Sequence, residues 1–152
     1  MITLTLTEII IRISVAVGLG ALLGLERTFA GKNAGLRTYA MVSLGSALFI
    51  IIAEIVSSSV PNSNPLLLGS AIITGIGFIG AGLVLFQDHK VTGLTTAAGL
   101  WVSAGIGMAS GYGLYQIAIV AFVAALMVFT LFWFIESILK KLSYDREKRL
   151  KI

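Results

Sequence analysis

Residues 26–38 read ERTFAGKNAGLRT, and this short stretch lies between two long apolar runs of the chain. It holds three of the eleven Lys and Arg residues: Arg27, Lys32 and Arg37. A soluble protein has no reason to place a basic loop between two strings of Leu, Ile, Val, Ala and Gly. In a membrane protein, such a loop stays on the cytoplasmic side and fixes the orientation of the chain. The stretch therefore predicts two membrane helices joined on the cytoplasmic side.

The composition of the whole chain also indicates an integral membrane protein. Of the 152 residues, 57% are hydrophobic and 12% are charged, whereas roughly 25% are charged in soluble domains. No charged residue occurs in the 45 residues from 91 to 135, and none in residues 55–87. Uncharged apolar runs longer than about 18 residues are typical of bilayer spans. We therefore predict an all-α, polytopic transmembrane helical bundle.

Five spans fit the pattern of apolar runs, and each is long enough for a hydrocarbon core of about 30 Å. The long uncharged run is divided at its turn-forming residues 111–113 (GYG). The predicted spans are 6–25, 38–57, 66–86, 94–110 and 114–135. They form a transmembrane domain over residues 1–139, which a basic cytoplasmic tail follows at 140–152.

The distribution of Lys and Arg predicts the orientation of these spans. Ten of the eleven basic residues lie in three segments, 26–37, 87–90 and the region after Glu136, whereas the two other connections are uncharged. Five alternating spans place the N-terminus outside and the C-terminus in the cytoplasm. The tail is a positive-inside anchor, with anionic lipid binding as a second interpretation. The N-terminus lacks the basic opening of a secretory signal, so we expect it to belong to the first span.

Glycines inside the predicted spans suggest close helix packing. The pairs Gly20–Gly24 and Gly107–Gly111 have GxxxG spacing, which lets two helix backbones approach within the membrane. We expect the glycines of the third span at the centre of the bundle: Gly75, Gly77, Gly80 and Gly82. An alternative is that these glycines open backbone carbonyls toward an ion. Three of them match GxGxxG, but the match lies inside an apolar span without the strand that nucleotide binding requires.

Charged residues within the spans are candidates for function because burying them in a bilayer costs free energy. Glu8 and Arg12 are four residues apart and can pair on one helix face. Glu54 is placed to reach the same pair, so the sequence predicts an ion cluster near the outer surface. No charge falls at the predicted midplane of a span, which argues against a carboxylate-based transporter.

The sequence contains no recognisable catalytic machinery. It has no cysteine, and its single histidine, His89, lies on a predicted cytoplasmic turn. HExxH needs two histidines, and GxSxG is absent. We therefore expect a protein that is not an enzyme and has no cofactor, with Mg²⁺ as a candidate ligand or substrate. The net charge of +4 reflects topology, so we expect no nucleic-acid partner.

Two segments, GALLGLERTFAGKNAGLRTYAMVSLGSALF and ITGIGFIGAGLVLFQDHKVTGLTTAAGLWVSAGIGMASGYG, resemble the N-terminal membrane domain of the MgtC/SapB family. The resemblance covers residues 18–113 in matching order. It implies a multi-pass protein of the bacterial inner membrane. It also implies a connection with growth in low magnesium, acid or stress adaptation and, in pathogens, virulence. Family members are often labelled magnesium transporters, whereas some inhibit the rotary ATP synthase.

The resemblance can be carried over to particular residues of this chain. The family's characteristic positions are Glu26, Arg27, Gly35, Arg37, Thr38, Gly80, Gly82, Gly93, Thr95, Thr96 and Trp101. Well-known members carry a cysteine where this chain has Val102. Many also continue into a soluble ligand-binding-like domain, so regulation through such a domain is not assumed for a sequence that ends at Ile152.

The matched residues suggest a polar cluster on the cytoplasmic side of the bundle: Glu26, Arg27, Arg37, Thr38, Asp88, Thr95 and Thr96. We expect Glu26 to pair with an arginine and Arg37 to contact loop carbonyls. The two threonines are expected to cap the fourth helix. An equally weighted alternative is that this network only holds the bundle together.

Two functions fit this sequence. The first is a regulatory or interaction protein that acts in magnesium homeostasis or stress through membrane partners. Those partners are a homo-oligomer or other membrane proteins, with the ATP synthase suggested by family resemblance. The second is a transporter or channel for a divalent cation. Mg²⁺ prefers oxygen ligands and gives up its water reluctantly, so a path lined only by glycine suits it poorly.

Overall fold

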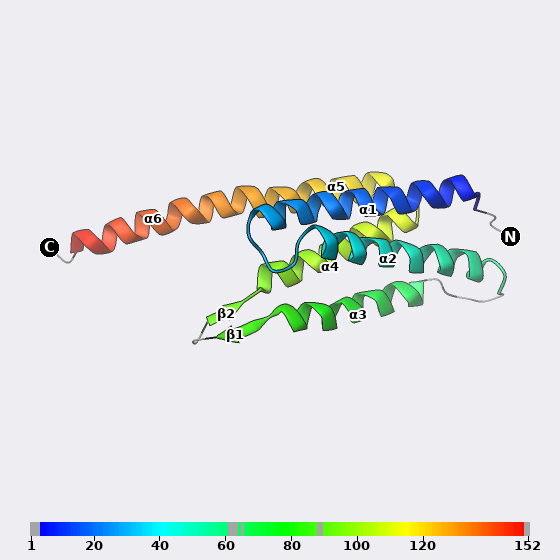
Figure 1. Ribbon diagram of the computed structural model, residues 1–152, viewed down its shortest axis with the longest axis horizontal. Coiled ribbons are helices and arrows are strands. Elements are labelled where there is room, and N and C mark those ends of the chain that lie inside the picture. The colour runs from blue at the N-terminus through cyan, green and yellow to red at the C-terminus, as the bar shows by residue number, and fades with distance from the viewer. Residues whose placement is uncertain (1–3, 61–63, 65, 88–89, 151–152) are drawn as a thin grey trace.

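The computed structural model shows an elongated bundle of helices with one short β-hairpin (Figure 1). It describes residues 4–60, 64, 66–87 and 90–150, with the backbone alone for 66, 85–87, 90 and 144–150. The helices lie side by side along the long axis (Figure 1). In chain order the elements are α1 (Leu6–Phe29), α2 (Leu36–Ser57), α3 (Leu66–Leu83), β1 (Leu85–Gln87), β2 (Lys90–Thr92), α4 (Leu94–Gly111), α5 (Tyr115–Met127), η1 (Val128–Phe132) and α6 (Trp133–Leu150). The predicted all-α bundle is confirmed.

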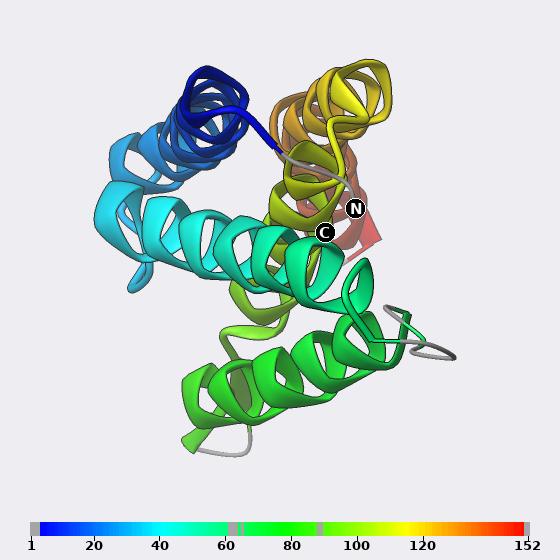
Figure 2. The ribbon, with the colours of Figure 1, turned by 90° about the vertical axis from the view of Figure 1, so that its right-hand side faces the viewer.

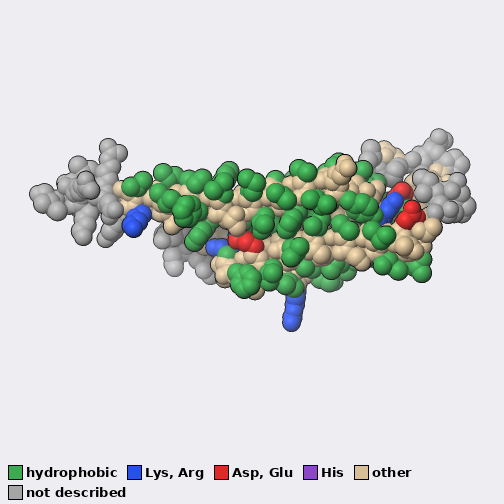
Figure 3. All heavy atoms as spheres, turned by 90° about the horizontal axis from the view of Figure 1, so that it is seen from above, with side chains coloured by type: hydrophobic (Ala, Val, Ile, Leu, Met, Phe, Trp, Pro, Cys, Tyr) green, Lys and Arg blue, Asp and Glu red, His purple; other side chains and the backbone are tan. Residues whose placement is uncertain are grey.

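Three helical segments among the described residues are long and apolar enough to cross a membrane: Leu6–Phe29, Leu36–Ser57 and Tyr115–Ser143. A shorter apolar helix, Leu67–Leu83, accompanies them. Many large hydrophobic side chains point outward, and Phe78, for example, is 78% exposed. Figure 3 shows such side chains along the length of one face. In water this surface would be costly, whereas lipid tails are its natural solvent. The chain is a multi-pass membrane protein.

One end of the bundle, which we call the basic end, gathers the residues of the opening motif. The last turn of α1, the first turn of α2, the β-hairpin and the start of α4 all lie there (Figure 1). The other end, called the opposite end, holds the start of α1 and the end of α4. The predicted assignment of the basic end to the cytoplasm remains a prediction.

The first helix is longer than the predicted span 6–25, because α1 continues through Glu26 and Arg27 to Phe29. These two residues therefore belong to the last helical turn and not to a loop. The helix ends at Phe29, and Gly31, two residues later, has a φ of 66° in the left-handed region that favours glycine. The Lys32 N–H donates to the Arg27 carbonyl at 3.0 Å, and the Gly31 N–H donates to Thr28 at 3.1 Å. This paired capping pattern shortens the loop to residues 30–35.

Small residues bring α1, α2 and α4 into backbone contact. A Cβ on Gly20 would lie 2.7 Å from the Ser43 Cβ, and one on Gly24 would lie 2.8 Å from the Gly35 carbonyl. On α4, a Cβ on Gly107 would overlap the Ser43 carbonyl, and one on Gly111 would lie 2.8 Å from the carbonyl of Ala47. The two GxxxG pairs of the sequence thus lie at the contacts of α2 with α1 and with α4 (Figure 2).

The glycines of α3 correct an expectation. Figure 2 shows α3 at the edge of the bundle, away from α1 and α5. A Cβ on Gly75, Gly77 or Gly82 would have no described atom within 4 Å, whereas one on Gly80 would touch Ala97 at 3.5 Å. The third span is therefore not at the bundle centre. The number of glycines in this span did not predict its position, because α3 packs inward through the face that holds Ile72 and Ile76.

The segments after α3 and α4 also differ from the predicted spans. The predicted third span ran to residue 86, but α3 ends at Leu83 and a hairpin of two three-residue strands follows, with Leu85 opposite Thr92. The predicted fifth span ended at 135, but the helical path runs through α5, η1 and α6 to Leu150. Residues that were expected to form a tail therefore continue this helix, because nothing in 133–150 breaks it: neither Gly nor Pro occurs there.

The opposite end is held by Arg12. Its Nη1 donates to Glu54 Oε2 at 2.5 Å and to the Gly111 carbonyl at 2.7 Å, so one side chain joins α1, α2 and α4. Glu8 does not pair with Arg12 as predicted. Its carboxylate accepts the Thr5 N–H at 2.7 Å and closes a capping box at the start of α1. Glu8 therefore caps the start of α1 and is not part of the predicted ion cluster with Arg12 and Glu54.

Candidate functional site

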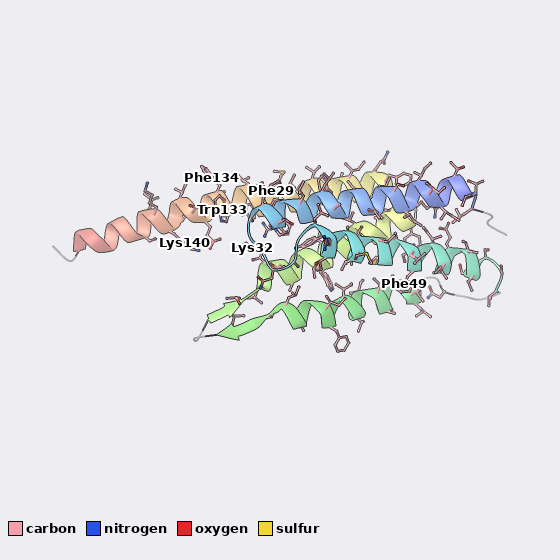
Figure 4. The ribbon with its side chains drawn as sticks, in the orientation of Figure 1. Phe29, Lys32, Phe49, Trp133, Phe134 and Lys140 are labelled. Carbon is pink, nitrogen blue, oxygen red and sulfur yellow. The ribbon has the colours of Figure 1, made fainter. Side chains whose placement is uncertain are left out.

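The basic end contains a cavity of about 1270 Å³ between α1, the start of α4 and the η1–α6 segment. Its lining is mainly apolar and aromatic. Phe29, Lys32, Trp133 and Phe134 are labelled around it in Figure 4, where α6 leaves the bundle. The lining residues are Leu22, Leu25, Glu26, Arg27, Phe29, Ala30, Lys32, Val91, Gly93, Leu94, Thr95, Thr96, Val128, Phe129, Thr130, Phe132, Trp133, Phe134 and Glu136.

Arg27 and Glu26 form the buried ion pair of this cavity. The Arg27 Nη2 donates to Glu26 Oε1 at 2.7 Å, and the Arg27 Nε donates to Glu26 Oε2. The Arg27 side chain is 5% exposed and that of Glu26 is 20% exposed. Both carboxylate oxygens of Glu26 are therefore occupied by one guanidinium, in the two-point geometry that suits this pair.

The guanidinium of Arg27 also lies over an aromatic ring. Its Cζ is 3.7 Å from the centroid of Phe129, a distance at which the face of the ring attracts a cation. Phe129 belongs to η1, a π-helical turn, and such turns frequently occur at functional sites. The ring also packs against Gly99 of α4, where a Cβ would lie 2.6 Å from the ring edge. The π-helical turn thus places an aromatic face over a buried charge.

Tyr39 joins α2 to α4 beside this pair. Its buried hydroxyl donates to the Thr96 carbonyl at 3.2 Å, and the Ser103 hydroxyl donates to the Tyr39 carbonyl at 2.9 Å. Ser43, one turn further along α2, donates to the Ala16 carbonyl of α1 at 2.7 Å. In lipid the hydrophobic effect does not drive helices together, so hydrogen bonds of this kind between helices help to stabilise their association. They fix α4, and with it one wall of the cavity.

Thr28 connects the two ends of the α1–α2 loop beside the cavity. Its Oγ1 donates to the Gly24 carbonyl at 3.0 Å and accepts the Leu36 N–H at 3.0 Å, so it joins the end of α1 to the start of α2. A Cβ on Gly35 would overlap this hydroxyl. The family's Gly35 position thus has a steric reason in this chain.

The model of the MgtC family matches residues 13–138, which is most of the chain and runs from within α1 to the first turns of α6. The chain belongs to the MgtC family. Three relatives illustrate the similarity. YhiD of Escherichia coli strain K12, named as a proposed magnesium transporter, is 41% identical over 130 residues, which cover 82% of this chain and 60% of YhiD.

Two further relatives carry the name MgtC itself. Protein MgtC of Brucella abortus strain 2308 is 43% identical over 110 residues, covering 72% of this chain and 45% of that protein. Protein MgtC of Salmonella typhimurium strain 14028s is 42% identical over 112 residues, covering 74% and 47%. The chain thus matches between about half and three-fifths of the length of these curated relatives. No solved structure gives a significant match.

The structure brings together only part of the polar cluster that the sequence predicted for this MgtC-family chain. Glu26, Arg27, Thr95 and Thr96 line the cavity. Arg37 and Thr38 lie on the first turn of α2 and do not line it, and Arg37 is exposed with no hydrogen bond to the described residues. Its expected contact with loop carbonyls is therefore not formed. Asp88 lies outside the described residues.

The threonines do not cap α4. The N-cap is Gly93, with φ of 87° and no side-chain cap, and the threonines follow inside the first turn. A Cβ on Gly93 would overlap the Leu83 carbonyl. Only glycine therefore fits the position that connects the hairpin to α4. Thr96 instead contributes its backbone carbonyl to Tyr39.

Several cavity residues were not predicted from the sequence as site residues, among them Phe129, Glu136 and Lys32. Phe129 and Glu136 lie more than ninety residues from the opening motif, and nothing in local spacing joins them to it. Lys32 was counted only as a topology signal. The one available indication was the stripe Gly99, Ser103, Gly107 and Gly111, whose four-residue spacing predicts that α4 presents one small-residue face to a neighbour.

Proposed function

We propose that this MgtC-family chain is a regulatory or interaction protein of the inner membrane that acts in magnesium homeostasis or in adaptation to acid and other stress. The name of the relative YhiD supports the connection with magnesium. The connection with acid and other stress rests on the family resemblance. The role as a regulator rests on the state of the buried carboxylates. Glu26 and Glu54, the carboxylates inside the described bundle, are each bound to an arginine, Arg27 and Arg12.

This pairing disfavours direct handling of Mg²⁺ by the helices. Mg²⁺ takes near-octahedral oxygen ligands and is usually held by one or two carboxylates. Glu26 has both oxygens on one guanidinium and so has little left to offer a metal ion, and Glu54 accepts from Arg12 through Oε2. Among the residues that the structure describes, no group of three or more His, Cys, Asp or Glu side chains is placed to hold one. The second candidate is a divalent-cation transporter, which the name of YhiD favours.

Flux and rescue measurements separate the two functions. We expect purified protein in liposomes to give no Mg²⁺ entry above that of empty liposomes, as measured by an enclosed Mg²⁺-sensitive dye. Expression should nevertheless restore growth in low magnesium to a strain that lacks its own family member. Protein-dependent flux that Glu26→Gln abolishes would establish the transporter and end the regulator proposal.

The substitution Arg37→Ala tests in the rescue measurement whether Arg37 contacts a partner. Its side chain is exposed and makes no hydrogen bond to the described residues, so Arg37→Ala should leave thermal unfolding unchanged. If Arg37 contacts a partner, the same change abolishes rescue. Lys141→Ala removes another exposed positive charge and serves as the control. Full rescue by Arg37→Ala would remove this residue from the proposed function.

A further inference from the structure

The cavity at the basic end has apolar walls along helices that are long enough to span a membrane. Leu22 belongs to α1, and Val128 and Phe132 belong to the Tyr115–Ser143 segment. Its volume of about 1270 Å³ exceeds the roughly 300–1,000 Å³ of ordinary small-molecule sites. An empty space of this size forfeits the dispersion contacts of its walls, and water against apolar walls finds few polar partners. The cavity therefore favours an elongated apolar occupant.

The charges that line the cavity select the polar part of that occupant. Both carboxylates are already paired, Glu26 with Arg27 and Glu136 with Lys140 at 2.7 Å. Lys32 is exposed and makes no hydrogen bond to the described residues, although it lies near enough to Glu136 for the two charges to attract each other. Counting Lys140, which pairs with Glu136 from outside the lining, three positive charges (Arg27, Lys32 and Lys140) stand against two carboxylates, so the net charge at this end of the cavity is positive, which suits an anion.

Aromatic rings near Lys32 indicate where the polar and apolar parts of the occupant meet. Trp133 is 65% exposed and Phe29 is 83% exposed, and both line the cavity. Figure 4 shows them with Lys32 where α6 leaves the bundle. Tryptophan is enriched at membrane–water interfaces because one part of its ring system is apolar and its N–H is polar.

We propose that this cavity binds one anionic phospholipid of the surrounding membrane. An acyl chain lies between α1 and the α5–η1–α6 segment, and the headgroup phosphate lies at the Lys32 ammonium. The bilayer supplies this molecule at high local concentration, and it combines the hydrocarbon that the walls require with the anion that Lys32 requires. The proposal is independent of any role in magnesium homeostasis.

Quenching of Trp133 fluorescence by brominated lipid tests the proposal. The chain has two tryptophans, so Trp101→Phe leaves Trp133 as the single reporter, and circular dichroism verifies that the full chain still folds. The variant is reconstituted in phosphatidylcholine vesicles that contain a small fraction of brominated lipid. Phosphatidylglycerol brominated on its acyl chains should quench Trp133 at least about twofold more than the same fraction of brominated phosphatidylcholine.

Three further variants locate the lipid. Lys32→Gln should remove the difference between the two lipids, whereas Lys141→Gln, an exposed basic residue outside the lining, should preserve it. Leu22→Phe, which adds volume to the wall, should weaken quenching by the anionic lipid, and Leu48→Phe on exposed α2 surface should not.

Several results would overturn the proposal. Equal quenching by the two lipids would show that no headgroup is selected. Equal losses with Lys32→Gln and Lys141→Gln would show diffuse surface attraction in place of a site. Protection of Trp133 from both brominated lipids would show that protein fills the cavity, either a second copy or another membrane protein.

Discussion

At the scale of single residues, Arg27 shows how this chain keeps a charge inside a membrane protein. Two hydrogen bonds to Glu26 and the ring of Phe129 surround the guanidinium. Neighbours at i and i+1 do not face each other on a helix, so spacing gave no reason to choose Arg27 over Arg37 as the partner of Glu26. Phe129, about one hundred residues later, covers the guanidinium from another helix. Local spacing contains no information on this distant contact.

Arg12 gives the same lesson at the opposite end. Spacing of four residues favoured a pair with Glu8, but the structure pairs Arg12 with Glu54, 42 residues away. Helical periodicity predicts which residues share a face, whereas it contains no information on which other helix will cover that face. The existence of charge pairs could therefore be predicted from the sequence, and their partners could not.

The substitution Glu26→Gln tests the importance of the buried pair. It keeps the shape of the side chain and leaves Arg27 charged and buried without a counter-ion. We expect a loss of about 3 kcal/mol in the free energy of unfolding, as for other broken buried pairs. Unfolding in detergent, followed by circular dichroism, measures the change.

The exposed pair of Glu136 and Lys140 provides the control, since Glu136→Gln removes the same charge from a side chain that is 62% exposed. Exposed pairs are often worth nothing measurable, so this variant should unfold like the parent. Equal stability of Glu26→Gln and the parent would mean that Arg27 is held by packing and Phe129 alone.

At the scale of elements, glycine spacing indicated which helices can approach closely but not which ones do. The GxxxG pairs of α1 and α4 lie against α2, whereas a Cβ on three of the five glycines of α3 would meet no described atom within 4 Å. The two cases look alike in sequence because each is a run of small residues in an apolar span. The difference lies in the side chains of α2, where Ser43 and Ala47 continue a small-residue face that meets α4.

Two glycines on α4 allow a matched test of that interface. A Cβ on Gly107 would overlap the backbone of Ser43, whereas one on Gly105 would have nothing within 4 Å. Gly107→Ala should therefore destabilise the bundle by about 1–3 kcal/mol through overpacking. Gly105→Ala should be neutral or slightly stabilising, because alanine is the better helix former. The comparison uses unfolding in the same detergent, and equal effects would contradict the α2–α4 contact.

At the scale of the whole molecule, the sequence predicted the bundle well and its ends poorly. A helix occurs at each predicted span, because long apolar runs have few other ways to satisfy their backbone in lipid. The ends of the helices depend on finer features. Helix α1 continues to Phe29 and is followed by the capping pattern at Gly31, and α3 is followed by a hairpin that connects to α4 at Gly93. The cavity was not predictable, since it is formed by parts of the chain that are distant in sequence.

The orientation of the molecule can be measured directly, because the chain contains no cysteine. Asn33 lies in the loop of the basic end and Ser59 lies after α2 at the opposite end, and both are exposed. A membrane-impermeant thiol reagent should label Ser59→Cys in intact cells and Asn33→Cys only in inverted vesicles, as the positive-inside rule requires. Labelling of both from one side would contradict the predicted topology.

The two arginine–glutamate pairs also determine how the bundle responds to voltage. A single charge that crosses the membrane changes in energy by about 2.3 kcal/mol for each 100 mV. Each arginine is within hydrogen-bonding distance of its own carboxylate, so the two members of a pair lie at nearly the same depth and the field acts on them in opposite directions. The membrane potential therefore exerts almost no net force on either pair, and the contact of α1 with α2 and α4 that Arg12 makes can stay in place while the potential rises and falls.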